Sequence, residues 1–351
     1  MSYTYPMTPQ AMFEDRFEQF VTLGIPRTQV EAVRNSINDM WGAGQGGWTF
    51  EWSALARRYA DADQPYMASL AYGCAKFPCL ANDSRREALA NQVTAYLAAA
   101  PTFPVRFERR MIDTPYLGGT VATPTHLFSV NGNYSQAPVL LLSAGVDTWK
   151  MDIHAMCVAF AKKLGITVLA FDHPGTGESP VALTIEADEI VLGLAKVARA
   201  IGNGNVAHMG ISFGGNYSAM TGLMGAVDAS VVLGGPIDGA FARDILEALP
   251  YGMPDIIGND MGFENKPSVA DFVGAAAKFS RRGLLGRIDN APMLVINGAD
   301  DYFVPQSDTR VFEGRPKTDV HLIPGTGHCA FTKLPDVLSL IFRWLPTQIG
   351  L

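Results

Sequence analysis

The period of the hydrophobic positions divides the chain into two parts. In the first hundred or so residues, apolar residues recur at three- and four-residue spacing, which is typical of amphipathic helices. Phe13 and Phe17 begin one such stripe, and Thr8 with Pro9 supplies an N-cap and a first-turn proline before it. We therefore predict an all-helical cap domain at residues 1–103.

The second helix of this domain has its own start and stop signals. Thr28 and Glu31 form a capping-box pattern, Trp41 falls on the apolar stripe, and Gly42 is a natural end. Two further helices are expected, the later one after Asp83.

From residue 104 the hydrophobic pattern changes to that of strands. The stretch PTFPVRFERRMI alternates with a period of two, and the continuous apolar runs PVLLLSAG, TVLAFDHPG and VAHMGIS then alternate with helical segments. Such runs are typical of a mostly parallel sheet with helices on both faces, which is an α/β fold. We predict a catalytic domain at residues 104–351, with a helical insertion at about 239–290.

Composition narrows the choice of partner. The 351 residues are 48% hydrophobic and 17% charged, which favours a globular protein, and the formal net charge of -7 argues against binding nucleic acid. The amino-terminal stretch lacks a signal-peptide pattern, and no apolar run approaches the roughly 20 residues that cross a bilayer. We expect a cytoplasmic enzyme with no membrane partner and a small-molecule substrate.

The sequence contains no pattern for a metal or a cofactor. Its four cysteines, Cys74, Cys79, Cys157 and Cys329, are spaced for neither a disulfide framework nor a zinc site, and we expect ordinary buried thiols. The glycine-rich DHPGTGES lacks the lysine of a phosphate-binding loop, so we interpret it as a tight turn.

Ser212 is the candidate nucleophile. It lies in GISFGG, between Gly210 and Gly214, after an apolar strand and before a helix. Such a turn holds its central residue in a strained conformation, and the neighbouring positions have no room for side chains. The backbone N–H of Phe213 is then the first predicted oxyanion donor, and that of Val146, in SAGVDTWK, the second.

A serine hydroxyl needs a base and an acid to become a nucleophile. His328 follows the last strand in PGTGH, and Asp301 follows the preceding strand in NGADDYFVP. Asp300 is the alternative acid. Neighbouring side chains point in different directions, so only one of the two aspartates should reach His328, and we prefer Asp301. The order serine, acid, histidine is that of α/β-hydrolases. The remaining histidines are expected to be structural: His126, His154, His173, His208 and His321.

Together these motifs resemble the α/β-hydrolase superfamily, in the branch of 2,6-dihydroxypseudooxynicotine hydrolase, the fungal yellowish-green heptaketide hydrolase and the FrsA-like fermentation-respiration switch proteins. The resemblance covers nearly the whole chain. It implies a helical cap over a serine hydrolase core, a homodimer, and catalytic roles for the three matching residues. Some relatives use a further acid after the strand that follows the nucleophile helix, and Asp238 is the residue near that point here.

The resemblance implies cleavage of an ester or lactone, or of a carbon–carbon bond in an aryl ketone or β-diketone. Aromatic residues are candidates to line a pocket for an aromatic or polyketide-like substrate; they are Trp48, Trp52, Tyr72 and Trp149. Two alternatives stay open: an acyltransferase with the same three residues, and a catalytically silent binding or regulatory protein on this scaffold.

Overall fold

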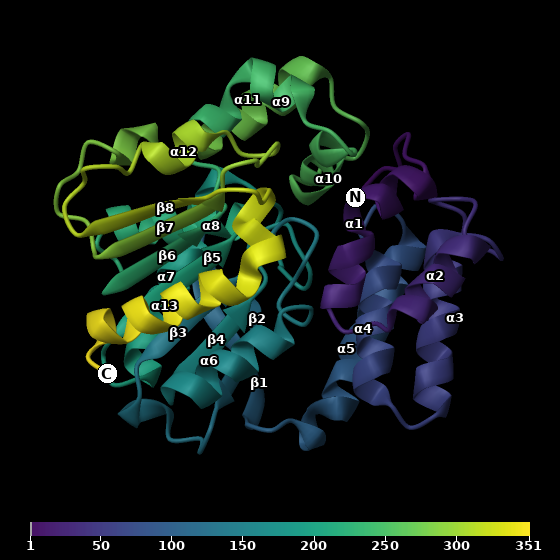
Figure 1. The fold of residues 1–351 in the computed structure, drawn as a ribbon, viewed down its shortest axis with the longest axis horizontal. Helices are drawn as coiled ribbons and strands as arrows, with labels where there is room; N and C mark the ends of the chain where they lie inside the picture. Colours follow the sequence, from purple (N-terminus) through teal and green to yellow (C-terminus); the bar gives the residue numbers. More distant parts are fainter. Residues whose placement is uncertain (1) are drawn as a thin grey trace. The chain divides into compact units, whose positions relative to one another are not determined.

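The computed structural model describes residues 2–351, and its chain forms two compact units (Figure 1). We call them the helical unit and the sheet unit. The helical unit holds the described residues up to Phe103 with Met151–His154 and Pro250–Pro267; the sheet unit holds Pro104–Lys150, Ala155–Leu249 and Ser268–Leu351.

The helical unit includes two segments that the sequence assigned to one continuous catalytic domain. In the first, Asp152 accepts hydrogen bonds from Lys76 at 2.8 Å and Gln92 at 2.7 Å. In the second, Asn259 Oδ1 accepts a hydrogen bond from the Tyr3 backbone N–H at 3.0 Å. These hydrogen bonds join residues far apart in sequence, so no local sequence pattern predicts that the two segments belong to the helical unit.

The described residues up to 103 form five α-helices, one more than the four that the hydrophobic pattern predicts. They are α1 (Pro9–Thr22), α2 (Arg27–Ser36), α3 (Trp48–Asp61), α4 (Pro65–Lys76) and α5 (Asp83–Ala99). At the start of α1 the Thr8 hydroxyl accepts a hydrogen bond from the Ala11 N–H at 3.2 Å, as its N-cap pattern predicts.

The predicted boundaries of α2 are wrong. The helix begins two residues earlier than the expected capping box, after Pro26, and no side chain caps it. It ends at Ser36, because the backbone N–H groups of Asn38 and Asp39 bond instead to the Gly46 carbonyl, at 2.9 and 3.2 Å. These two N–H groups are the donors that a continuing helix would use, so the helix stops and Trp41 lies outside it.

Aromatic side chains form the centre of the helical unit. Trp48 and Trp52 are fully buried and pack with Phe13 and Phe20. The ring centroids of Phe13 and Trp48 lie 4.8 Å apart, and those of Phe20 and Trp52 lie 5.4 Å apart. Because each of these rings removes a large apolar area from water, the cluster is a main source of the unit's stability.

The sheet unit is built on eight strands in the order β1-β2-β4-β3-β5-β6-β7-β8. Their bounds are β1 (Arg106–Tyr116), β2 (Gly119–Ser129), β3 (Val139–Ser143), β4 (Thr167–Phe171), β5 (Val206–Ile211), β6 (Ala229–Leu233), β7 (Met293–Gly298) and β8 (Thr318–Ile323). The β1–β2 hairpin and the β2–β4 pair are antiparallel, and all other pairs are parallel. Every residue of β3 to β7 is buried, which explains why these strands are mostly apolar.

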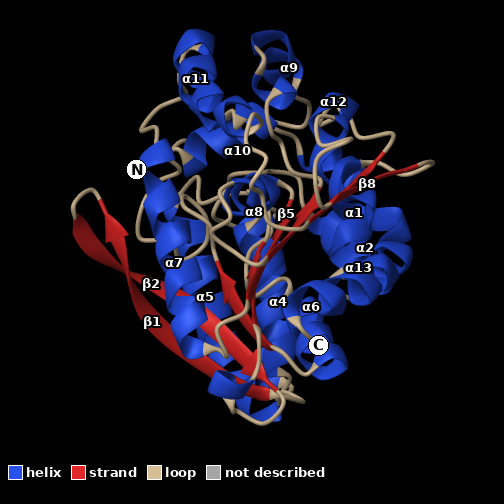
Figure 2. Ribbon diagram, turned by 90° about the vertical axis from the view of Figure 1, so that its left-hand side faces the viewer, coloured by secondary structure: helices blue, strands red, loops and turns tan. Residues whose placement is uncertain are grey.

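Helices cover both faces of this sheet. Figure 2 shows α7 (Asp188–Ile201) and α8 (Phe213–Leu223) on one face, and α6 (His154–Leu164) with α13 (Leu334–Ile349) on the other. The span predicted as a helical insertion contains α9 (Arg243–Ala248), α10 (Met253–Asp260) and α11 (Val269–Ala276), and α12 (Gln306–Arg310) follows β7. Because strands β3 to β8 are parallel, their carboxyl ends lie at one edge of the sheet, where the following loops can hold functional side chains.

We predict that Trp48→Ala destabilises the protein by about 3–5 kcal/mol, because it leaves a cavity in the aromatic cluster. Phe50→Ala is the matched control: this ring lies on the same helix and is 36% exposed, so its loss costs less than about 1 kcal/mol. Urea unfolding followed by far-ultraviolet circular dichroism measures both variants. Equal losses of stability would contradict the assignment of Trp48 to the core.

Candidate active site

Ser212 lies at the sharp turn between β5 and α8. Its backbone has φ 55° and ψ −126°, a conformation that residues other than glycine rarely adopt. The turn is held by two hydrogen bonds, from Ser212 N–H to the Leu233 carbonyl and from Gly215 N–H to the Ser212 carbonyl, each 2.8 Å long. This strained turn places the hydroxyl at the amino terminus of α8.

Close backbone packing explains the two glycines beside the serine. A Cβ atom on Gly210 would lie 1.9 Å from the Gly214 carbonyl oxygen. A Cβ atom on Gly214 would lie 2.5 Å from the Ala144 carbonyl oxygen. Neither position has room for a side chain, so the glycines predicted from sequence are required by the turn.

His328 connects the serine to an acid. Its Nε2 lies 2.8 Å from Ser212 Oγ, and its Nδ1 lies 2.7 Å from Asp301 Oδ2. A carboxylate oxygen only accepts, so Nδ1 carries a proton, and in the neutral imidazole Nε2 then faces the hydroxyl with its lone pair. The structure therefore brings the three residues predicted from sequence into one hydrogen-bonded chain.

The surroundings of Asp301 favour its ionised form. Burial alone raises the pKa of a carboxyl group, but His328 and the hydrogen bonds from Asn297 and the Phe303 backbone outweigh it and lower the pKa. Oδ1 accepts from the backbone N–H groups of Phe303 at 2.7 Å and Val304 at 3.2 Å. The acid is thus a fixed negative charge beside the imidazole.

The same pairing shifts the titration of the histidine. Burial opposes a charged imidazole, but Cys329 and the Asp301 carboxylate outweigh it and raise the pKa of His328 above the ordinary value. A proton is therefore held more tightly on this imidazole than on an exposed one.

The two alternative acids have other surroundings. Asp300 is exposed at the start of the same loop. Asp238 accepts a hydrogen bond from Ser280 Oγ at 2.6 Å and forms an ion pair with Arg282 at 3.0 Å. Of the three candidate carboxylates, the one bonded to His328 is Asp301.

The loop after β3 lies against the serine. A Cβ atom built on Gly145 would lie 3.0 Å from Ser212 Cβ and 3.1 Å from Ser212 Oγ, so a side chain at this position would crowd the serine. The Gly214 N–H donates to the Ala144 carbonyl at 3.0 Å, which ties this loop to the turn at Ser212. Val146, the predicted second oxyanion donor, and Phe213, the predicted first, are both buried at 4% exposure.

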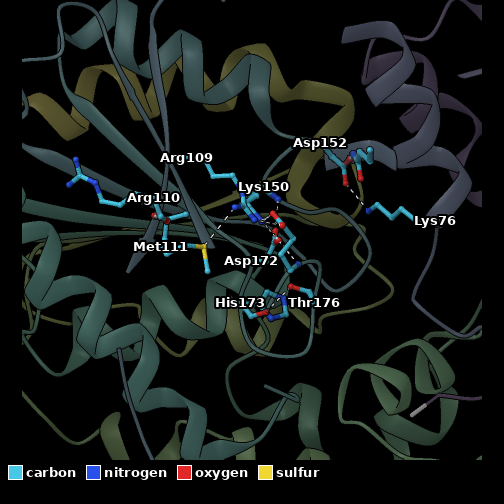
Figure 3. A network of polar contacts seen from close by, with 12 residues as sticks. Lys76, Arg109, Arg110, Met111, Lys150, Asp152, Asp172, His173 and Thr176 are labelled. Carbon is cyan, nitrogen blue, oxygen red and sulfur yellow. Dashed lines mark hydrogen bonds and ion pairs between the residues drawn. The ribbon is translucent and has the colours of Figure 1, made fainter. Parts of the chain in front are cut away.

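A buried ionic cluster anchors the far end of this loop (Figure 3). Lys150 Nζ donates to Asp172 Oδ2 at 2.5 Å and lies 2.8 Å from Glu178 Oε2, and the Lys150 backbone N–H donates to Asp172 Oδ1 at 2.7 Å. Burial opposes the charge of Lys150, but the two carboxylates outweigh it and raise its pKa. The turn DHPGTGES thus supplies both carboxylates of this cluster, a role that its sequence did not reveal.

His173, in the same turn, packs against Phe213, the residue after Ser212. Its ring centroid lies 5.4 Å from that of Phe213 and 5.6 Å from that of Tyr217. Burial lowers the pKa of His173 to about 4, so the ring is neutral, and its Nδ1 lies 3.0 Å from the Pro174 carbonyl oxygen. His208 is also buried and neutral, with a pKa lowered to about 3 by burial.

The aromatic residues predicted to line a pocket lie in several places. Trp48 and Trp52 belong to the aromatic cluster of the helical unit, and Tyr72 packs against that cluster while half-buried. Trp149 is buried in the sheet unit, where its indole N–H donates to the Val146 carbonyl at 3.1 Å. Trp149 therefore braces the loop that carries Val146.

The described residues 2–351 contain neither a metal-binding cluster nor a membrane-spanning helix. No group of three or more His, Cys, Asp and Glu side chains there is placed to hold a metal ion. Within the same residues, no helix is both long and apolar enough to span a membrane. The four cysteines are free and buried.

Comparison with known proteins adds relatives in sequence. The sequence model of a family described as esterase FrsA-like matches residues 24–328. Esterase FrsA of Vibrio cholerae is 28% identical over 298 residues, which cover 78% of this chain and 70% of the relative. Esterase FrsA of Klebsiella pneumoniae is 26% identical over 330 residues, 87% of this chain and 77% of the relative.

Two solved structures share the fold. AbyA5 has a TM-score of 0.81 at 18% identity and covers 95% of this chain and 94% of its own. The 2,6-dihydroxy-pseudo-oxynicotine hydrolase has a TM-score of 0.74 at 20% identity, with 95% and 96% covered. The fold class predicted from the sequence, an α/β-hydrolase fold, is confirmed.

We predict that Lys150→Met destabilises the protein by about 3–5 kcal/mol, because it leaves two carboxylates buried without their cation. Arg243→Met is the control: its ion pair with Glu247 is exposed, and its loss changes stability by less than about 1 kcal/mol. Chemical denaturation of both variants gives the comparison. A Lys150→Met protein as stable as the control would show that the cluster contributes nothing to the fold.

Proposed function

The chain belongs to the FrsA-like esterase family and is a hydrolase, and from this premise we propose that Ser212, His328 and Asp301 cleave a carbonyl substrate through an acyl-enzyme. One observation carries the proposal: the hydroxyl, the imidazole and the carboxylate form an unbroken chain, with hydrogen-bond distances of 2.8 and 2.7 Å. This is the geometry that general-base activation of a serine requires.

The reaction proceeds in two halves. His328 Nε2 takes the proton of Ser212 as Oγ attacks the carbonyl carbon, and Asp301 stabilises the resulting imidazolium. The oxyanion accepts hydrogen bonds from the backbone N–H groups of Phe213 and Val146. His328 then protonates the leaving group, and a water molecule, deprotonated by the same imidazole, releases the acid and restores the serine.

The proposed substrate is an ester of a small organic acid. An ester leaves as an alcohol after one proton transfer from His328, and the chain's relatives are esterases by name. In a β-diketone or aryl ketone, the leaving group is a carbanion that His328 protonates at carbon. Both substrates pass through the same acyl-enzyme, so product analysis separates them.

Covalent labelling tests the nucleophile. A fluorophosphonate probe should label the wild-type protein, because Ser212 Oγ displaces fluoride from phosphorus. Ser212→Ala should not be labelled, while Ser339→Ala, which removes an exposed serine from α13, should be labelled as the wild type is. An unlabelled wild type would favour a catalytically silent scaffold. Product analysis with p-nitrophenyl esters, β-diketones and alcohol acceptors then distinguishes esterase, carbon–carbon hydrolase and acyltransferase.

The pH profile tests the base. Protonated His328 cannot accept the serine proton, so kcat/KM rises with pH as the imidazole loses its proton. Because its pKa is raised above the ordinary value of 6.5, the midpoint of this acidic limb should lie above pH 6.5.

Two acid variants control this measurement. Asp301→Asn removes the neighbouring charge, so it should lower the rate about 10⁴-fold and shift the midpoint to lower pH. Asp300→Asn, at the exposed neighbouring position, should leave both unchanged. A wild-type midpoint below pH 6.5, or equal effects of the two variants, would refute these assignments.

A further inference from the structure

Asn297 is a buried polar residue in an otherwise apolar strand. It occupies the last but one position of β7 and is 1% exposed. A buried amide must find hydrogen-bond partners, because leaving its polar atoms unpaired costs free energy. Its partners identify what it does.

The Asn297 side chain connects the acid loop to the histidine loop. Its Nδ2 donates to Asp301 Oδ2 at 2.8 Å. Its Oδ1 accepts from the Cys329 backbone N–H at 3.0 Å and from the Gly298 backbone N–H at 2.9 Å. Two backbone donors face the oxygen and a carboxylate faces the nitrogen, so the amide fits in one orientation.

On the acid side, the amide adds a neutral donor to the oxygen that orients the imidazole. Asp301 Oδ2 accepts from both Asn297 Nδ2 and His328 Nδ1, the latter at 2.7 Å. Hydrogen bonds to the ionised form keep a carboxylate charged. Asn297 therefore favours the ionised Asp301 that holds the proton of His328 on Nδ1.

On the histidine side, the amide holds a strained backbone. Cys329 has φ 55° and Ala330 has φ 50°, both in the left-handed region. Such a conformation persists only where its surroundings fix it. The Asn297 oxygen fixes the N–H of Cys329, the residue directly after His328, and so limits where the imidazole can lie.

We propose that Asn297 is a positioning residue, which keeps Asp301 ionised and holds the His328 loop within reach of Ser212. The proposal rests on the function proposed above. Asn297 acts through Asp301 and His328, and it does not touch the reacting atoms.

Asn297→Asp is the sharpest test, because it keeps the size of the side chain and replaces its donor with an acceptor. Two carboxyl groups then face each other and cannot both ionise, so they share a proton and Asp301 is no longer a fixed negative charge beside His328. We expect the acidic limb of kcat/KM to move away from its wild-type pH. We also expect kcat to fall about 10- to 100-fold while KM for a p-nitrophenyl ester changes less than about threefold.

Asn290→Asp is the matched control. Asn290 is a buried amide just before β7, and its Nδ2 donates to the Ala291 and Pro316 carbonyls, each at 2.9 Å. Its replacement disturbs a buried amide away from the acid, so stability falls while the pH midpoint stays at the wild-type value. Circular dichroism and thermal melting verify that each variant folds.

If Asn297→Asp does not fold, Asn297→Ser decides the question, because its shorter side chain cannot reach both loops and should lower kcat with little effect on KM. An unmoved pH midpoint with kcat within twofold of wild type would overturn the proposal. Equal effects of Asn290→Asp would overturn it too, because they would show a merely structural role. Labelling of the wild type at Ser212 tests the proposed function separately, so the two failures are distinguishable.

Discussion

The His328 imidazole makes two hydrogen bonds, of 2.8 and 2.7 Å, and both must hold at once. Each partner comes from a different loop, so the arrangement depends on three chain segments ending at the same place. The parallel pairing of β5, β6, β7 and β8 ensures this, because the carboxyl ends of parallel strands lie at one edge of a sheet. The parallel strands are thus what sets the distances at the site.

This precision requires unusual backbone conformations. Ser212 and Cys329 both have φ 55°, and each is fixed by a hydrogen bond to a neighbouring strand or its end. Positive φ at a residue other than glycine costs of order 1–3 kcal/mol, so the conformations persist only because the surrounding sheet determines them. Gly210 and Gly214 also help to fix the Ser212 turn, because they have no side chains where two backbone segments nearly touch.

The sequence predicts those parts of this arrangement that have a local signature. The strands, the glycine-flanked serine and the acid and histidine loops all follow from neighbouring residues, and the sheet brings Ser212, Asp301 and His328 together. Asn297 and Lys150 escape such reasoning, because their partners lie on other loops and a lone polar residue in a strand carries no pattern. The same cause explains the misplaced end of α2, which a turn to Gly46 decides.

Two buried aspartates, each after a parallel strand, show how a countercharge sets a role. Asp172 faces Lys150, a cation that stays protonated, so its charge is compensated at all times and suits a structural anchor. Asp301 faces His328, whose charge changes during the proposed reaction, so it needs other donors while the imidazole is neutral. Backbone N–H groups and the Asn297 amide supply them without adding a positive charge. A second cation in place of Asn297 would also stabilise Asp301, but it would repel the imidazolium that forms when the serine attacks. A neutral donor at this position is therefore compatible both with an ionised Asp301 and with a histidine that gains and loses a proton in the proposed reaction.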